Sequence, residues 1–122
     1  MLIDNFYEVV SLETANTNQH TALVKLNTSH DVFKGHFPNN PVMPGICMIQ
    51  IIKELSEEIL KYELFMEQVL NVKFMTLINP EKCNELTFSL QIDEVDGAVK
   101  VKSTIDFEGA VALKMSSTYK KK

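Results

Sequence analysis

A single helix-forming segment lies among segments that alternate like strands, and this feature restricts the possible folds more than any other. Residues 46–62 are predicted to form a helix, because Pro44 stands near the start and the first turns are almost wholly apolar. A helix that is apolar all round is expected to be buried all round. Polar residues return from Lys53 onward, so the far end of this helix is expected at the surface.

The rest of the chain has the pattern of an antiparallel sheet. Apolar residues alternate with polar ones, as in Ala22, Val24 and Leu26, which predicts strands with one buried face. The pairs Asp96-Gly97 and Glu108-Gly109 are typical of hairpin turns. The expected strands are residues 6–13, 21–28, 69–78, 85–95, 99–107 and 111–119. Together they predict one α+β domain over residues 1–122, with a sheet of about six strands wrapped around one central helix.

Charge and composition exclude several classes of protein. The chain of 122 residues has 12 Lys, no Arg and 16 Asp plus Glu, and its net charge of −4 argues against a nucleic-acid binder. Its apolar runs are too short to span a membrane, and its first ten residues do not form a signal peptide. Two cysteines make no disulfide framework, so we expect reduced thiols and a cytoplasmic location.

The segment that can carry chemistry precedes the predicted helix. Residues 35–45 read GHFPNNPVMPG, in which three prolines define a shaped loop. His36 can move a proton near neutral pH, and the backbone N–H of Gly45 lies where a helix N-terminus can hold a developing oxyanion. An apolar helix beside them can line a tunnel for an acyl chain. A base and an oxyanion site together suit abstraction of a proton next to a carbonyl.

Plainer interpretations apply to the other reactive residues. His20 is expected to be exposed beside a strand, and His30 to be a cap or turn residue; the His30–His36 spacing does not make a metal site. Cys47 is interpreted as a small core residue. The methionines expected to fill the core are Met43, Met48, Met66, Met75 and Met115.

Residues 33–46 resemble the signature loop of the β-hydroxyacyl-acyl carrier protein dehydratases (FabZ/FabA-like), whose pattern G-H-F-P-x-x-P-V-M-P-G is met at every fixed position. The likeness extends more weakly to Val72, Lys73 and Phe74. The resemblance implies a hot-dog fold and a lyase that removes water from a (3R)-hydroxyacyl thioester on the phosphopantetheine of acyl carrier protein. It implies dimers with sites at the interface, which leaves a homodimer, a dimer of dimers or a pairing with a second hot-dog subunit open, and it implies no metal or organic cofactor.

The same resemblance assigns roles to particular residues. His36 would remove the C2 proton, the Gly45 N–H would polarise the thioester carbonyl, and Gln50 occupies the position of the family's acid, which the partner chain's helix supplies. The expected substrate-binding residues are Phe37, Pro38, Val42, Met43, Pro44, Ile46 and Phe74.

Gln50 is the main departure from the family, because an amide cannot ionise as the usual Glu or Asp does. Loss of a general acid costs roughly 10²–10⁴ in rate. Gln50 can still donate a hydrogen bond, and Glu54 lies one helical turn later on a similar face, about 5–6 Å along the helix. The acidic carrier protein should dock on basic residues, and the candidates are Lys34, Lys53 and Lys73.

Three functions remain open from the sequence. The first is a working dehydratase run by His36 with Gln50 as a hydrogen-bond donor. The second is a catalytically degenerate subunit that pairs with a second, active hot-dog chain carrying the missing acid. The third is a hot-dog acyl thioesterase, since one fold hosts several reactions.

Overall fold

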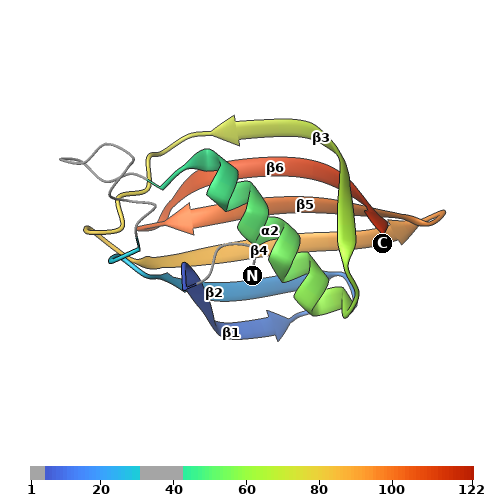
Figure 1. Ribbon diagram of the computed structural model, residues 1–122, viewed down its shortest axis with the longest axis horizontal. Coiled ribbons are helices and arrows are strands. Elements are labelled where there is room, and N and C mark those ends of the chain that lie inside the picture. Colours follow the sequence, from blue (N-terminus) through green and yellow to red (C-terminus); the bar gives the residue numbers. More distant parts are fainter. Residues whose placement is uncertain (1–4, 31–42) are drawn as a thin grey trace.

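The structure is a computed structural model that describes residues 5–30 and 43–122. Six antiparallel strands form one sheet in the order β1-β2-β4-β5-β6-β3, and the helix α2 lies across one face of it (Figure 1). The elements are β1 Tyr7–Thr14, β2 Gln19–Leu26, α2 Gly45–Leu60, β3 Leu64–Phe74, β4 Glu85–Val95, β5 Ala98–Phe107 and β6 Ala110–Lys121. The hot-dog architecture expected from the sequence is therefore confirmed.

The strands form where apolar and polar residues alternate. On β4, Leu86, Phe88 and Leu90 are buried, while the residues between them are half-buried on the other face. Both predicted hairpins are present, since Asp96 and Gly97 have φ of 51° and 79°, and Glu108 and Gly109 have φ of 50° and 80°. Two successive positive φ values are the geometry of the tight turn that matches the twist of paired strands.

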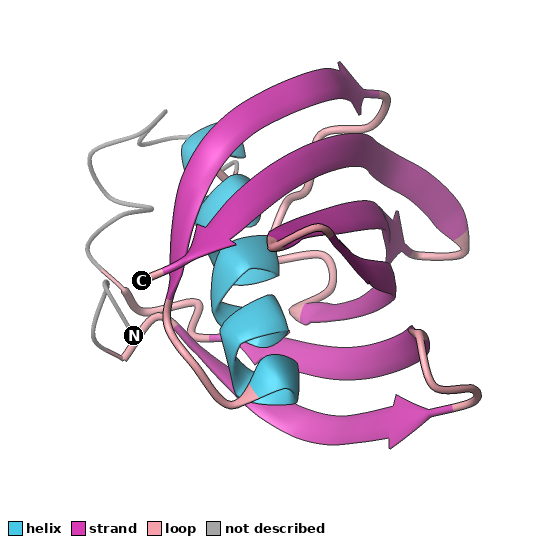
Figure 2. Cartoon of the chain, turned by 90° about the vertical axis from the view of Figure 1, so that its right-hand side faces the viewer, coloured by secondary structure: helices cyan, strands magenta, loops and turns pink. Residues whose placement is uncertain are grey.

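The sheet curls around α2, so that the helix lies inside its concave face (Figure 2). The helix buries Cys47, Met48, Ile51, Ile52, Leu55 and Ser56 against the sheet. Ile46 is 73% exposed, so the expectation of a helix buried on every side is wrong for this chain taken alone. A sheet covers only one side of a helix, and the side that carries Ile46 faces away from it. In the described part of the chain, no helix is long and apolar enough to cross a membrane.

Other expectations are also corrected. The strand predicted at residues 69–78 is displaced, since β3 spans Leu64–Phe74. The prediction missed its bounds because this edge strand is largely exposed, has two register shifts and lacks alternation. His20 is buried (7% exposed) rather than exposed, because β2 begins at Gln19 and His20 shares the inner face with Ala22. Met75 is 47% exposed and so does not fill the core, whereas Met43, Met48 and Met115 do.

Candidate active site

The start of α2 is anchored to the sheet side of the molecule. The backbone N–H of Met43 donates a hydrogen bond of 2.8 Å to the carbonyl of Ile78, and both side chains are buried in the core. Pro44 then serves as the N-cap in an extended conformation, with φ −64° and ψ 139°. No side chain caps the helix within the described residues, and its first turn holds no acidic residue. The first N–H groups of α2 therefore keep their capacity to bind a polar group of a ligand.

Gly45 is the first residue of α2, and the ring of Phe74 lies directly over it. A Cβ atom built on Gly45 would stand 2.9 Å from Cε1 and from Cζ of Phe74, closer than real Cβ contacts allow. Phe74 is the last residue of β3 and is 52% exposed. The ring in this position fills the space that a side chain at residue 45 would take, and because Phe74 is half exposed, movement of its ring would open that side of the backbone to a carbonyl group.

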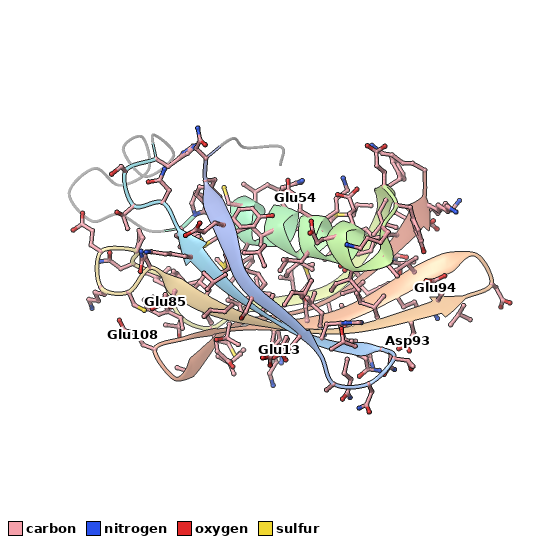
Figure 3. The ribbon with its side chains drawn as sticks, turned by 90° about the horizontal axis from the view of Figure 1, so that it is seen from below. Glu13, Glu54, Glu85, Asp93, Glu94 and Glu108 are labelled. Atoms are coloured by element: carbon pink, nitrogen blue, oxygen red, sulfur yellow. The ribbon has the colours of Figure 1, made fainter. Side chains whose placement is uncertain are left out.

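Gln50 lies one and a half turns along α2 and is held by a neighbouring carboxylate. Its Nε2 donates a hydrogen bond of 2.9 Å to Oε2 of Glu54, and the hydroxyl of Tyr7 donates one of 2.7 Å to Oε1 of Glu54. The i, i+4 spacing places Gln50 and Glu54 on one helix face, and Figure 3 labels Glu54 midway along the helix. Tyr7 comes from the first strand, so a residue of the sheet's far edge supports this face of the helix.

The environment of Tyr7 keeps its hydroxyl protonated. Burial is the main cause that raises the pKa of Tyr7 far above its usual value, and the hydrogen bond to Glu54 and the charges of Glu54, Glu58 and Glu57 add to it. A protonated Tyr7 is a hydrogen-bond donor at every physiological pH. Sequence reasoning identified Glu54 as a neighbour of Gln50 but missed Tyr7, which is 47 residues away in the chain.

A shallow groove runs between α2 and the start of β3, beside Gln50. It has a volume of about 250 Å³ and is lined by Ile46, Ile49, Gln50, Lys53, Leu64, Phe65, Met66 and Lys122. Lys53 forms an ion pair of 3.8 Å with Glu57, whose Oε2 also accepts a 2.8 Å hydrogen bond from the backbone N–H of Leu64. The helix and β3 are thus tied together at the end of the groove, and Gln50 presents a polar group on an otherwise apolar wall.

The structure places part of the expected site. Gly45, Phe74 and Gln50 lie on the exposed side of α2 and at the end of β3, whereas Met43 belongs to the core. His36, Phe37, Pro38 and Val42 lie outside the described residues, as does Lys34. Cys47 is buried and burial raises the pKa of its thiol, which agrees with a core residue rather than a nucleophile.

Solved structures confirm the class of the fold, which is the hot-dog fold. The chain superposes on a chain of the dehydratase heterocomplex ApeI:P from Xenorhabdus doucetiae with a TM-score of 0.76 and 20% identity, over 93% of this chain and 96% of that one. It superposes on a putative thioesterase from Lactococcus lactis with a TM-score of 0.72 and 10% identity, over 99% and 95% of the two chains. Identities this low establish the fold alone.

The sequence comparisons establish the family. A family profile described as "ApeI-like: ApeI dehydratase" matches residues 12–114, so the chain belongs to the ApeI-like dehydratase family. It is also 27% identical over 120 residues to the 3-hydroxyacyl-[acyl-carrier-protein] dehydratase FabZ of Oenococcus oeni, covering 90% of this chain and 81% of that protein. The FabZ of Rickettsia massiliae is 27% identical over 107 residues, covering 80% and 72%.

Proposed function

We propose that the protein takes part in the dehydration of a (3R)-hydroxyacyl thioester carried on acyl carrier protein, and that it uses no metal or organic cofactor. The observation that carries the proposal is the start of α2 at Gly45, which no side chain of residues 5–30 or 43–122 caps and which follows the sequence segment that contains His36. A free helix N-terminus can stabilise the negative charge that develops on a thioester oxygen. This is what removal of a proton from the adjacent carbon requires.

The reaction can be written with each group in a stated role. His36 takes the proton from C2, and the electrons of that C–H bond form the C2=C3 double bond while the C3–O bond breaks. The leaving hydroxide must gain a proton to become water, and the product is the trans-2-enoyl thioester. Gln50 cannot supply that proton, because an amide does not ionise. The proton therefore has to come from the imidazolium that His36 has become, from a carboxylic acid elsewhere or from solvent.

A second hot-dog chain is the partner that we propose for this task. Seven of the eleven exposed large apolar side chains of the described residues lie on the start of α2, along β3 or just after it, among them Ile46, Phe65, Leu70, Phe74 and Leu77, and three others lie on β1. β3 is also an edge strand with unpaired backbone groups, which a partner strand can satisfy. The solved ApeI:P structure is a dehydratase heterocomplex, which favours a partner of a different sequence over a second copy.

The central experiment measures turnover of a (3R)-hydroxyacyl carrier protein by the purified chain, alone and mixed with a hot-dog chain encoded near it. Formation of the enoyl thioester that is lost in His36→Ala would support the dehydratase. Activity that appears only in the mixture, together with a heterodimer by native mass spectrometry, would identify the chain as a subunit whose partner supplies the acid. Absence of turnover in every mixture, with hydrolysis of the thioester instead, would favour the thioesterase alternative.

We propose that acyl carrier protein, which is acidic, presents the substrate. One surface of the sheet, on strands β3, β5 and β6, suits such a partner. Lys73, Lys102 and Lys114 are exposed on three neighbouring strands and line a hollow of about 620 Å³. Lys73 lies directly opposite Lys114, an arrangement of like charges that is unfavourable without a negative partner. Among the described residues, the ion pairs are Lys53–Glu57 and Lys120–Glu67, so none of these three lysines takes part in one.

Reversing two of these charges tests the docking surface. The double variant Lys73→Glu with Lys114→Glu is expected to raise KM for the carrier-borne substrate by about tenfold, because it replaces attraction by repulsion at this surface. The kcat/KM for the corresponding pantetheine thioester should not change. Lys25→Glu is the matched control, since Lys25 lies on β2 opposite Glu85. Equal losses with both substrates would rule out a role in carrier docking.

A further inference from the structure

The hydrogen bonds of Gln50 determine which end of its amide is available to a ligand. Nε2 donates to Oε2 of Glu54, and the other oxygen of Glu54 accepts the hydroxyl proton of Tyr7. Glu54 thus acts as an acceptor toward both neighbours, and an acceptor can be satisfied only by the NH₂ end of Gln50. Within the described ranges the Oε1 atom of Gln50 receives no hydrogen bond, and Gln50 lines the groove between α2 and β3.

We infer that Glu54 is a positioning residue, which turns Gln50 so that its carbonyl oxygen accepts a hydrogen bond from the 3-hydroxyl group of the acyl chain. The inference rests on the proposed function and deepens it. The residue at the acid position then recognises the hydroxyl that is to be lost and does not protonate it. This reverses the role expected from the sequence, where Gln50 was to be a hydrogen-bond donor.

Tyr7 occupies one oxygen of the Glu54 carboxylate and leaves the other for Gln50. Its hydroxyl stays protonated and is 2.7 Å from Oε1 of Glu54, so it donates to that oxygen and leaves Oε2 for Gln50. The link spans from the first strand of the sheet to the middle of α2, and Tyr7 is only 9% exposed. The ionised carboxyl of Glu54 has no proton to donate, so Gln50 must turn its NH₂ group toward it, and the hydrogen bond from Tyr7 holds the carboxylate in place. The sheet thereby fixes the position of the carboxylate that orients the Gln50 amide.

The variant Glu54→Gln is expected to invert this orientation while the side chains keep their shapes. The new amide can accept from Tyr7 with its oxygen, and its NH₂ group then faces Gln50. Gln50 must turn its own carbonyl toward that NH₂ group, so its Nε2 becomes the end that meets the ligand. The matched control is Glu58→Gln, the same exchange one turn further along α2 at an exposed residue.

Affinity for two ligands distinguishes the two orientations. A 3-hydroxyacyl pantetheine thioether can donate a hydrogen bond at C3, whereas its 3-oxo counterpart can only accept one. The parent and Glu58→Gln are expected to bind the hydroxyl ligand about three- to tenfold more tightly than the oxo ligand, as one hydrogen bond provides. In Glu54→Gln that preference should vanish or reverse, and Tyr7→Phe should weaken it. Each affinity is measured by titration calorimetry on the proposed complex or on the chain itself.

A second readout does not depend on catalysis or on a ligand. In ¹⁵N-labelled protein, the Gln50 side-chain NH₂ signal, identified by its loss in Gln50→Leu, is expected to shift with pH as the Glu54 carboxyl titrates. The shift should disappear in Glu54→Gln and persist in Glu58→Gln. A signal that titrates in none of the proteins would overturn the assigned orientation.

The outcomes separate this inference from the proposed function. Dehydration with equal affinity for the two ligands would overturn the inference and leave the function standing. Failure of both ligands to bind any variant would count against both the function and the recognition of a hydroxyl group. A Glu54→Gln variant that loses turnover and also loses the basic limb of its pH–rate profile would overturn the inference in another way, by making Glu54 the acid itself.

Discussion

Gln50→Glu is expected to raise the dehydration rate of the isolated chain by roughly 10²–10³. The substitution keeps the length of the side chain and replaces the Nε2 atom, which is 2.9 Å from Oε2 of Glu54, by a carboxyl oxygen. Two carboxyl groups at this separation cannot both ionise, so the pair retains one proton near neutral pH. Because the Tyr7 hydroxyl donates to Glu54, the proton is favoured on the new carboxyl group, where it can reach the leaving hydroxyl.

The pH–rate profile and a double variant test this explanation. The acid must be protonated, so the rate should fall as pH rises through the raised pKa of the carboxyl pair, and it should fall at low pH as His36 gains a proton. In Gln50→Glu combined with Glu54→Gln, the acid has lost its charged neighbour. Its pKa returns toward the ordinary value, so the basic limb should move to lower pH and most of the gain should vanish. An unchanged rate in a folded Gln50→Glu protein that still binds substrate would refute the expected role of position 50.

The fold was predictable because its signals are local. Alternation along β4 and β5 and the two turns with positive φ depend only on neighbouring residues, and they were placed within a residue or two. β3 could not be placed so well, because an exposed edge strand has no buried face to impose alternation. The burial of His20 follows from the same alternation once β2 is extended by two residues at its start.

The site was predictable only in part, and for a different reason. The spacing of Gln50 and Glu54 on one helix face is a local property, so their contact could be anticipated. The contribution of Tyr7 depends on how the first strand is packed beside the helix, which no local pattern reveals. The direction of the Gln50 amide follows from its hydrogen bond to the Glu54 carboxylate, which uses the NH₂ end, and for that reason the donor role suggested by the sequence gives way to the acceptor role that we infer toward a ligand.

Gly45→Ala is expected to lower kcat/KM for the dehydration by about 10²–10³ while the protein stays folded. The added methyl group would stand 2.9 Å from two atoms of the Phe74 ring, but that ring is half exposed and can move away. Alanine also favours a helix over glycine by about 0.5–1 kcal/mol, so the thermal midpoint should not fall. The loss would arise because the methyl group occupies the approach of the thioester carbonyl to the helix N-terminus.

A second substitution separates the methyl group from the displaced ring. Phe74→Leu removes the atoms that the new Cβ would touch, so Gly45→Ala combined with Phe74→Leu relieves the clash without removing the methyl group. If the start of α2 binds the reacting carbonyl, the double variant should remain as inactive as Gly45→Ala, and Phe74→Leu alone should change mainly KM. Recovery of activity in the double variant would instead show that the position of Phe74 matters and that the Gly45 N–H does not hold the oxyanion. The helix N-terminus would then have only a structural role. His36 would need a different hydrogen-bond donor to polarise the thioester carbonyl.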